Sequence, residues 1–324
     1  MAFEFTGSSL TFRLNGLDRF TANTSPYKAL ISNLGVDTLT STYQMFDNCS
    51  GLTEVLSIPD TSNVLRMEYM FRNCSGLTSL DVNNFNTSNV TTMSGMFDGC
   101  SGLTSLNVSG FNMNRVTNTS FMFRNCKKIP SLNVSNWNVS AVTDMSYMFV
   151  NCNSLTSLDV SNWNVSAVTD MTSLFVSCSG LTSLNVSNWD VSNVTHIYSM
   201  FEGCRSLTSL DLSSWNTKNL QAFGNIFHNC TNLTTINISG WDMSKINSNP
   251  SYLFDGCTNL TTVNVSGLNM SGFQTDEYGR VFEGCTSLNK LILGECNQAT
   301  YNWWYYYLQQ AGIQNNVTIE YTIV

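Results

Sequence analysis

Cysteine is the most reactive residue type in this sequence, and its spacing is regular. Of the 11 cysteines, all but Cys296 form a series at positions 49, 74, 100, 126, 152, 178, 204, 230, 257 and 285. Cysteines bind metals when they are clustered, as in Cys-x-x-Cys motifs, and the sequence contains no such cluster. We therefore expect neither a metal site nor a cofactor.

The same spacing bears on disulfide formation. If the cysteines of neighbouring repeats stack in register, their Cβ atoms lie about 4.8 Å apart, the spacing of paired strands. A disulfide needs Cβ atoms about 3.8 Å apart, and side chains stacked in register point the same way. The sequence therefore predicts buried thiols that behave as small apolar residues.

Histidines and carboxylates form no recognisable catalytic group. His196 and His228 fall at non-equivalent places of consecutive repeats, and no motif supplies a serine, cysteine or aspartate partner. Asp159 and Asp211 are two repeats apart, about 10 Å at the strand spacing, which is slightly too far for a glycosidase pair. Asp81 is farther still, so these carboxylates do not share a calcium ion. We expect no enzymatic activity.

A fixed interval of 25 to 28 residues is typical of a solenoid, in which each repeat forms one coil. The coil that begins at Cys152 continues with Leu155, Leu158 and Val160, the spacing of a leucine-rich repeat. This spacing predicts a short strand around Leu158–Val160, paired in parallel with its neighbours.

The second half of the coil carries apolar residues three to four positions apart: Val168, Met171, Leu174, Phe175 and Cys178. This spacing predicts a helix of about two turns with an inward apolar face. Thr169 stands where the helix N-cap belongs. Each coil is thus expected to contain one strand and one short helix.

An aromatic column follows the predicted strands, at Phe85, Phe111, Trp137, Trp163, Trp189, Trp215 and Trp241. An exposed column of rings would suit stacking on a carbohydrate. The rings stand where a leucine-rich repeat turns inward, however, so we expect them to pack inside the coil.

The ends of the chain differ from the repeats, as the ends of solenoids do. An N-terminal cap over 1–40 is expected to hold a hairpin (FEFTGSSLTFRL, turning near Gly7) and a short helix (YKALISNL, stopped by Gly35). A C-terminal cap over 296–324 is expected to hold a helix (NWWYYYLQQAG, ending at Gly312) and a closing strand (NVTIEYTIV). The predicted fold is α/β: a leucine-rich-repeat solenoid of about ten 25–28-residue coils over 41–295, capped at both ends.

Two surfaces are candidates for binding. Residues that flank the inward leucines and valines point outward, because alternate residues of a strand face opposite sides. The candidate ligand-binding residues among them are Ser131, Asn133, Ser157, Asp159, Ser161, Ser183, Asn185, Ser209 and Asp211. This polar face suits a glycan or an extended partner, or it serves only to keep the solenoid soluble. The aromatic cluster of the C-terminal helix cannot all face inward, so Trp303, Trp304 and Tyr306 are candidate partner contacts.

Composition excludes several partners. The chain has 14 Lys and Arg against 22 Asp and Glu, without a basic cluster, so neither nucleic acid nor an anionic membrane is expected. No segment approaches the ~20 apolar residues of a membrane span. The first residues, MAFEFTGSSLTFRLNG, lack the basic start and the apolar stretch of a secretory signal.

Aligned on the cysteines, the repeats read Cys-x-x-Leu-Thr-Ser-Leu-x-Val-Ser-x-Trp and then Val-Thr-x-Met-x-x-Met-Phe. Over residues 40–295 this pattern resembles the BspA-type leucine-rich repeat, found in surface proteins of mycoplasmas, oral bacteria and some protists. The resemblance implies an adhesin or surface lipoprotein and carries over no catalytic residue.

We therefore expect a non-enzymatic recognition or adhesion protein, extracellular or displayed on a surface, that binds a glycan or a protein on a target surface. The alternative is a virion component of the phage tail-fibre type, structural or receptor-binding, whose main contacts are other virion or appendage subunits. A virion protein reaches the outside without a secretory signal, and this keeps the alternative open.

Overall fold

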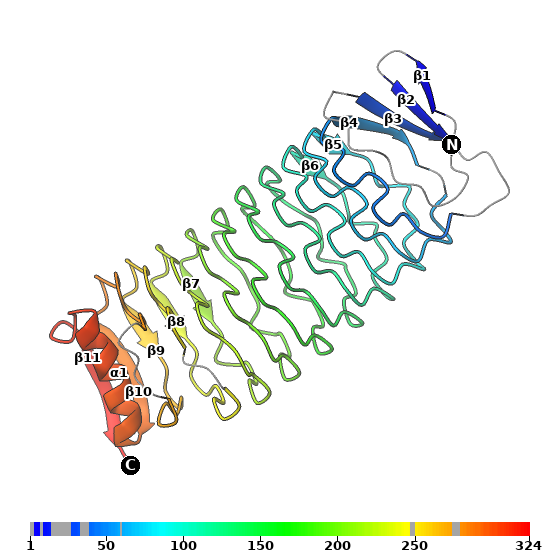
Figure 1. The fold of residues 1–324 in the computed structure, drawn as a ribbon. Helices are drawn as coiled ribbons and strands as arrows, with labels where there is room; N and C mark the ends of the chain where they lie inside the picture. The colour runs from blue at the N-terminus through cyan, green and yellow to red at the C-terminus, as the bar shows by residue number, and fades with distance from the viewer. Residues whose placement is uncertain are drawn as a thin grey trace. The chain divides into compact units, whose positions relative to one another are not determined.

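The computed structural model describes residues 3–6, 9–13, 27–32, 39–58, 60–246, 250–273 and 279–324 of the chain. The chain divides into two compact units, Met1–Leu158 and Asp159–Val324. Both units are built from turns of a parallel β-solenoid (Figure 1). The prediction of a repeat solenoid is therefore confirmed, whereas a leucine-rich repeat with one helix per coil is not.

The first unit begins with a four-stranded sheet in the order β1-β2-β3-β4. Its strands are β1 (Phe3–Thr6), β2 (Ser9–Arg13), β3 (Tyr27–Ser32) and β4 (Leu52–Ser57). β1 and β2 pair antiparallel, which confirms the predicted hairpin, although its turn at Gly7 lies outside the described residues. β2, β3 and β4 pair in parallel.

The helix predicted over YKALISNL is wrong for the part that the structure describes, because Tyr27–Ser32 forms β3. This strand lies between β2 and β4 and pairs with both. Six residues at a central position of a sheet gain backbone hydrogen bonds on both sides, and this outweighs the weak local preference for helix. The proposed stop at Gly35 lies outside the described residues.

The strand half of the coils is very short. In the first unit β5 (Ser79–Leu80) pairs in parallel with β6 (Ser105–Leu106), and Ser131 forms an isolated parallel bridge with Ser157. The sequence predicts a strand around Leu158–Val160. In place of a regular strand there, the structure has the single bridge residue Ser157, next to the predicted position. In each of these strands the leucine is buried and the serine exposed, as alternation requires.

The second unit holds a five-stranded parallel sheet in the order β11-β10-β9-β8-β7. Its strands are β7 (Ser209–Asp211), β8 (Thr235–Asn237), β9 (Thr262–Asn264), β10 (Lys290–Cys296) and β11 (Thr318–Ile323). The helix α1 (Gln298–Gln310) connects β10 to β11. Asn297 caps its start by accepting from the Thr300 N–H, and Gly312 follows its end with φ of 69°. The predicted C-terminal helix and closing strand are both confirmed.

The second half of each coil is not the helix that the apolar spacing predicts. Between Met171 and Cys178 the backbone φ is 57° at both Ser173 and Ser177, a left-handed value that an α-helix does not contain. The Leu174 N–H donates to the carbonyl of Met171, three residues back, at 3.2 Å. The segment is a series of tight turns, and in the part of the chain that the structure describes α1 is the one α-helix.

Hydrogen bonds between coils explain this difference. The N–H groups of Met171, Ser173 and Phe175 donate to carbonyls of the following coil at 2.8 to 2.9 Å. A helix would use these donors within the segment. Turns bring every third or fourth side chain inward much as a helix does, so the apolar spacing alone does not separate the two.

Thr169, predicted as a helix N-cap, and the threonines at the equivalent position of other coils (Thr117, Thr143 and Thr195) have a different role, since there is no helix to cap. Thr195 donates to the carbonyl of Thr169 through both its N–H, at 2.9 Å, and its hydroxyl, at 3.0 Å. Thr143 makes the same pair of bonds to the carbonyl of Thr117. These hydroxyls therefore join one coil to the next.

The inward apolar residues are buried as predicted, and they stack in columns within each unit. The ring centroids of Phe97 and Phe123 lie 5.6 Å apart, and those of Phe201 and Phe227 lie 6.0 Å apart. The aromatic corner column is also internal, with every tryptophan from Trp137 to Trp241 at most 3% exposed. The indole N–H of Trp189 donates to the Val160 carbonyl at 3.0 Å. A buried, satisfied ring cannot stack on a sugar, so this column is structural.

All 11 cysteines are buried free thiols, which confirms the prediction. The Cys152 thiol donates to the carbonyl of Phe123 at 3.2 Å, and the Cys204 thiol donates to that of Phe175 at 3.1 Å. Burial raises the pKa of each of these two thiols to about 12. The thiols therefore stay protonated and keep their S–H donors at neutral pH.

We predict that the native protein does not react with a thiol reagent such as DTNB at about pH 8, because thiolate is the reacting form and burial suppresses it. After unfolding in guanidinium without reductant, all 11 cysteines should react. The released chromophore measures both rates and totals. Rapid labelling of the native protein, or a total short of 11, would contradict the buried-thiol structure.

Candidate functional site

The candidate ligand-binding residues lie on the outer side of the strand half of the coils. Three of them, Ser131, Asn133 and Ser157, belong to the first unit, and the other six belong to the second. All are exposed except Ser161, which is half-buried. On β7 the exposed Ser209 and Asp211 flank a buried leucine. Within each unit these side chains are accessible to a partner.

The Asp and Asn members of this face also have a structural role. The Asp159 carboxylate accepts from the hydroxyl and the N–H of Ser161, at 2.7 and 3.1 Å. Asp211 and Ser213 repeat this Asx turn with the same distances. The Ser161 hydroxyl, followed by its N–H, lowers the pKa of Asp159. One carboxylate oxygen is thus committed to the turn, which leaves the other oxygen and the exposed serine hydroxyls to face a ligand.

The C-terminal aromatic cluster faces inward more than the sequence suggests. Trp303 is 2% and Trp304 0% exposed, and Tyr306 is half-buried. The Trp304 ring centroid lies 5.9 Å from that of Phe282. Trp304 thus packs against the coil that contains Phe282, and Trp303 packs against Trp304. The two indoles are therefore part of the core, which corrects the expectation that they contact a partner.

A row of charged side chains in the turn half of the coils was not predicted from the sequence. It consists of the residues two positions before the series cysteines, except before Cys152 and Cys178, where this position holds valine. From Asp47 to Arg124, in the first unit, acid and base alternate. Arg72 donates to both carboxylate oxygens of Asp47 at 2.7 and 2.6 Å, and Arg124 donates to those of Asp98 at 2.9 and 2.6 Å. The Arg72 guanidinium also lies 4.7 Å from the Tyr69 ring centroid. An alignment of the repeats on the cysteines displays this alternation.

In the second unit the same row carries Glu202, His228, Asp255 and Glu283. His228 Nδ1 lies 3.2 Å from the Glu202 carboxylate, and Nε2 lies 3.9 Å from that of Asp255. Burial raises the pKa of Asp255, and the nearby His228 opposes this effect. Among the described residues, no group of three or more His, Cys, Asp and Glu side chains is arranged to hold a metal ion.

Comparison with known families places the chain. The model of a family described as "Mycoplasma protein of unknown function, DUF285" matches residues 17–129, 40–158, 104–207 and 169–296. The chain belongs to this family. The overlapping matches follow one another along the repeats, as expected when one family model spans several coils. No curated protein matches the sequence.

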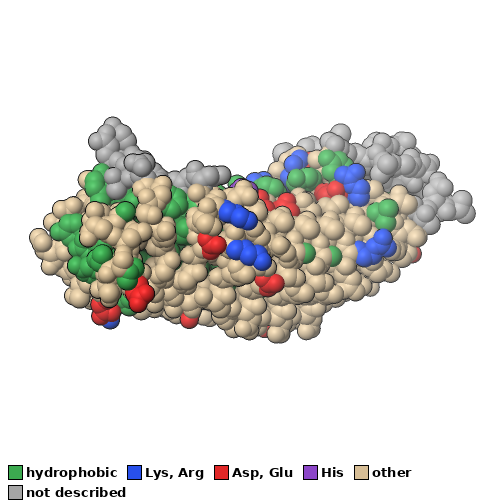
Figure 2. Space-filling view, turned by 90° about the horizontal axis from the view of Figure 1, so that it is seen from below, with side chains coloured by type: hydrophobic (Ala, Val, Ile, Leu, Met, Phe, Trp, Pro, Cys, Tyr) green, Lys and Arg blue, Asp and Glu red, His purple; other side chains and the backbone are tan. Residues whose placement is uncertain are grey.

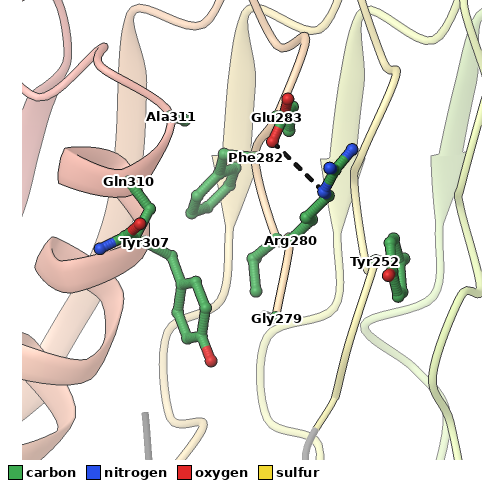
Figure 3. Close-up of a pocket in the computed structure, with 9 residues that line it drawn as sticks. Tyr252, Gly279, Arg280, Phe282, Glu283, Tyr307, Gln310 and Ala311 are labelled. Atoms are coloured by element: carbon green, nitrogen blue, oxygen red, sulfur yellow. Dashed lines mark ion pairs between the residues drawn. The ribbon is translucent and has the colours of Figure 1, made fainter. Parts of the chain in front are cut away.

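This DUF285 chain has a pocket of about 310 Å³ in the second unit. The pocket is lined by Tyr252, Gly279, Arg280, Val281, Phe282, Glu283, Tyr307, Gln310 and Ala311. In Figure 3 Arg280 lies between Tyr307 of α1 and Tyr252 of an earlier coil, and it points toward Glu283. The Arg280 Nε–Glu283 Oε2 distance is 3.5 Å and both side chains are 55% exposed, so solvent screens this pair. The pocket is lined by aromatic and hydrogen-bonding side chains.

The face of this DUF285 chain shown in Figure 2 is predominantly polar and uncharged in its described part. The face seen in Figure 2 shows a few acidic and basic side chains among a majority of other polar groups and backbone. In the described part of the chain, no helix has the length and apolar character that crossing a membrane requires.

The group formed by His228, Glu202 and Asp255 predicts that the stability of the protein depends on pH. Because the folded-state pKa of Asp255 is raised, its ionisation opposes folding as the pH rises through that pKa. The D255N variant should therefore unfold at a higher temperature than the wild type at neutral pH. This advantage should fade as the pH falls and Asp255 takes up its proton. Thermal unfolding followed by circular dichroism between about pH 4 and 8 measures it.

The matched control is D159N, because hydrogen bonds lower the pKa of Asp159. Its carboxylate contributes stability that is lost as the pH falls through the folded-state pKa, so D159N should give no gain at neutral pH. A D255N variant that is less stable than the wild type at neutral pH would show that attraction to His228 outweighs the burial of the carboxylate.

Proposed function

We propose that this chain is a non-enzymatic recognition protein that binds a glycan or a protein ligand on a target surface, through the outer polar face of its coils. The observation that carries the proposal is the recurrence of one exposed hydroxyl at the same position of successive coils, as at Ser183 and Ser209. The face is rich in hydrogen-bonding groups and nearly uncharged, which suits a neutral polar ligand that is itself repetitive.

Periodicity supports this reading. Coil neighbours place equivalent side chains about 4.8 Å apart, so an extended ligand meets the same donors and acceptors repeatedly. A single hydrogen bond of this kind contributes little to the binding free energy, but several of them together can hold a ligand. The BspA-type resemblance adds support, because the proteins with that repeat are mostly adhesins or surface lipoproteins. On this proposal the chain acts outside the cell or displayed on a surface.

The experiment is a glycan-array and cell-binding screen of the wild type, followed by bulky substitutions on the face. We predict that S131Y/S157Y in the first unit, or S183Y/S209Y in the second, lowers binding by at least about tenfold, because the rings keep the ligand from the polar side chains beside them. Biolayer interferometry with the recovered ligand measures the loss.

The matched controls are S140Y and S244Y, which enlarge exposed serines outside the strand columns, one in each unit. They should bind as the wild type does, and all variants should keep the wild-type melting temperature. Full binding by both double variants would move the site off this face. A wild type that binds no cell or glycan would favour the virion alternative, in which the main contacts are assembly subunits.

A further inference from the structure

The last strand of the second unit has an open edge. β11 is the outermost strand of its sheet and pairs with β10 (Figure 1). The N–H groups of Thr318 and Val324 donate to carbonyls on the β10 side, at 2.8 and 3.2 Å. Alternate residues of a strand direct their backbone groups to opposite sides, so those of Ile319, Tyr321 and Ile323 point away from β10. Among the described residues, no strand pairs with this edge.

The edge lacks the features that usually protect such strands. Natural edges carry lysine, proline or a bulge, or are covered by a loop, because an open row of N–H and carbonyl groups recruits other strands. β11 has the sequence TIEYTI, and the register shift in this pair lies in β10. The one charge of β11, at Glu320, is held 2.8 Å from Lys290 of the same chain.

The end of the strand is also apolar and exposed. Tyr321 is 46%, Ile323 43% and Val324 75% exposed, and these are among the most exposed large apolar side chains that the structure describes. Two tyrosines of α1 extend this surface. The Tyr301 ring centroid lies 4.5 Å from that of Tyr321 and 5.8 Å from that of Tyr305. Tyrosine-rich apolar surface beside open backbone groups is typical of protein interfaces.

We propose that β11 is a homodimerisation strand, which pairs antiparallel with β11 of a second copy of the chain about a two-fold axis at Tyr321. In this register Ile319 lies opposite Ile323 of the partner subunit. The residues with outward backbone groups become hydrogen-bonded pairs, each of which exchanges two N–H···O=C bonds.

The strand is complementary to itself in this register. Glu320 lies opposite Thr322 of the partner subunit, so no like charges meet across the axis. The apolar row of one strand continues the apolar row of the other, and the polar rows do the same. A two-fold arrangement uses the same edge in both copies, so association stops at a dimer. This inference is independent of the proposed ligand.

Substitution of Tyr321, at the two-fold axis, by charged residues of either sign tests the proposal. The full chain should sediment as a dimer at micromolar concentration. Both Y321K and Y321E should weaken the dimer by at least about tenfold, because each places like charges directly opposite each other. An equimolar mixture of the two variants should recover a dimer, since lysine then lies opposite glutamate. The Y321F variant, which keeps the ring, is the matched control.

Circular dichroism of each variant shows that the fold is kept, which is expected because Tyr321 is half exposed and its outward N–H is not needed by β10. A wild type that stays monomeric would overturn the proposal and leave the edge to a strand of another protein. Dimers that persist in both charged variants, or a mixture that stays monomeric, would equally overturn it, because Tyr321 would then not lie at the axis.

Discussion

Hydrogen bonds that leave one coil and end on the next are the interaction on which the rest of this structure depends. The N–H of Phe123 donates to the carbonyl of Met148 in the first unit, and the N–H of Phe175 donates to that of Met200 in the second, both at 2.9 Å. Equivalent residues are thereby held one above another. A side chain in such a column has copies of itself as neighbours, so its size and polarity must suit stacking. This explains why the inward positions vary so little between repeats.

The same constraint allows the residue type at the outer positions to vary, provided that the side chains there still form the hydrogen bonds of the turns. Asp159 and Asp211 show the compromise, because each points outward and yet holds an Asx turn with one carboxylate oxygen. The charged row before the cysteines shows another, because stacking brings Arg72 onto Asp47 and Arg124 onto Asp98. Stacked columns thus turn a simple repeat into ordered surfaces that differ in chemistry from one side of the coil to the other.

At α1 and β11 the chain no longer stacks one coil on the next, and other interactions act there. In the second unit Trp303 and Trp304 of α1 are buried, and β11 leaves one edge of backbone groups open. The proposed recognition face and the proposed dimer edge are therefore distinct surfaces with distinct physics: side-chain hydroxyls on one, backbone groups and tyrosines on the other. A dimer would present two polar faces to one target surface, and this would raise the avidity of individually weak contacts.

The sequence by itself determined the coil interval, the inward residues such as Leu155 and Phe175, the first hairpin, the C-terminal helix and strand, and the thiol state of the cysteines. Tertiary structure decided that Met171–Cys178 forms turns, that Tyr27–Ser32 is a strand, that Trp303 is buried, and that His228 lies between two carboxylates. The physical reason is how far apart in the sequence the interacting residues lie. Local spacing reports which side chains face inward, whereas the choice among helix, turn and strand was made by hydrogen bonds to a neighbouring coil or strand, distant in the chain.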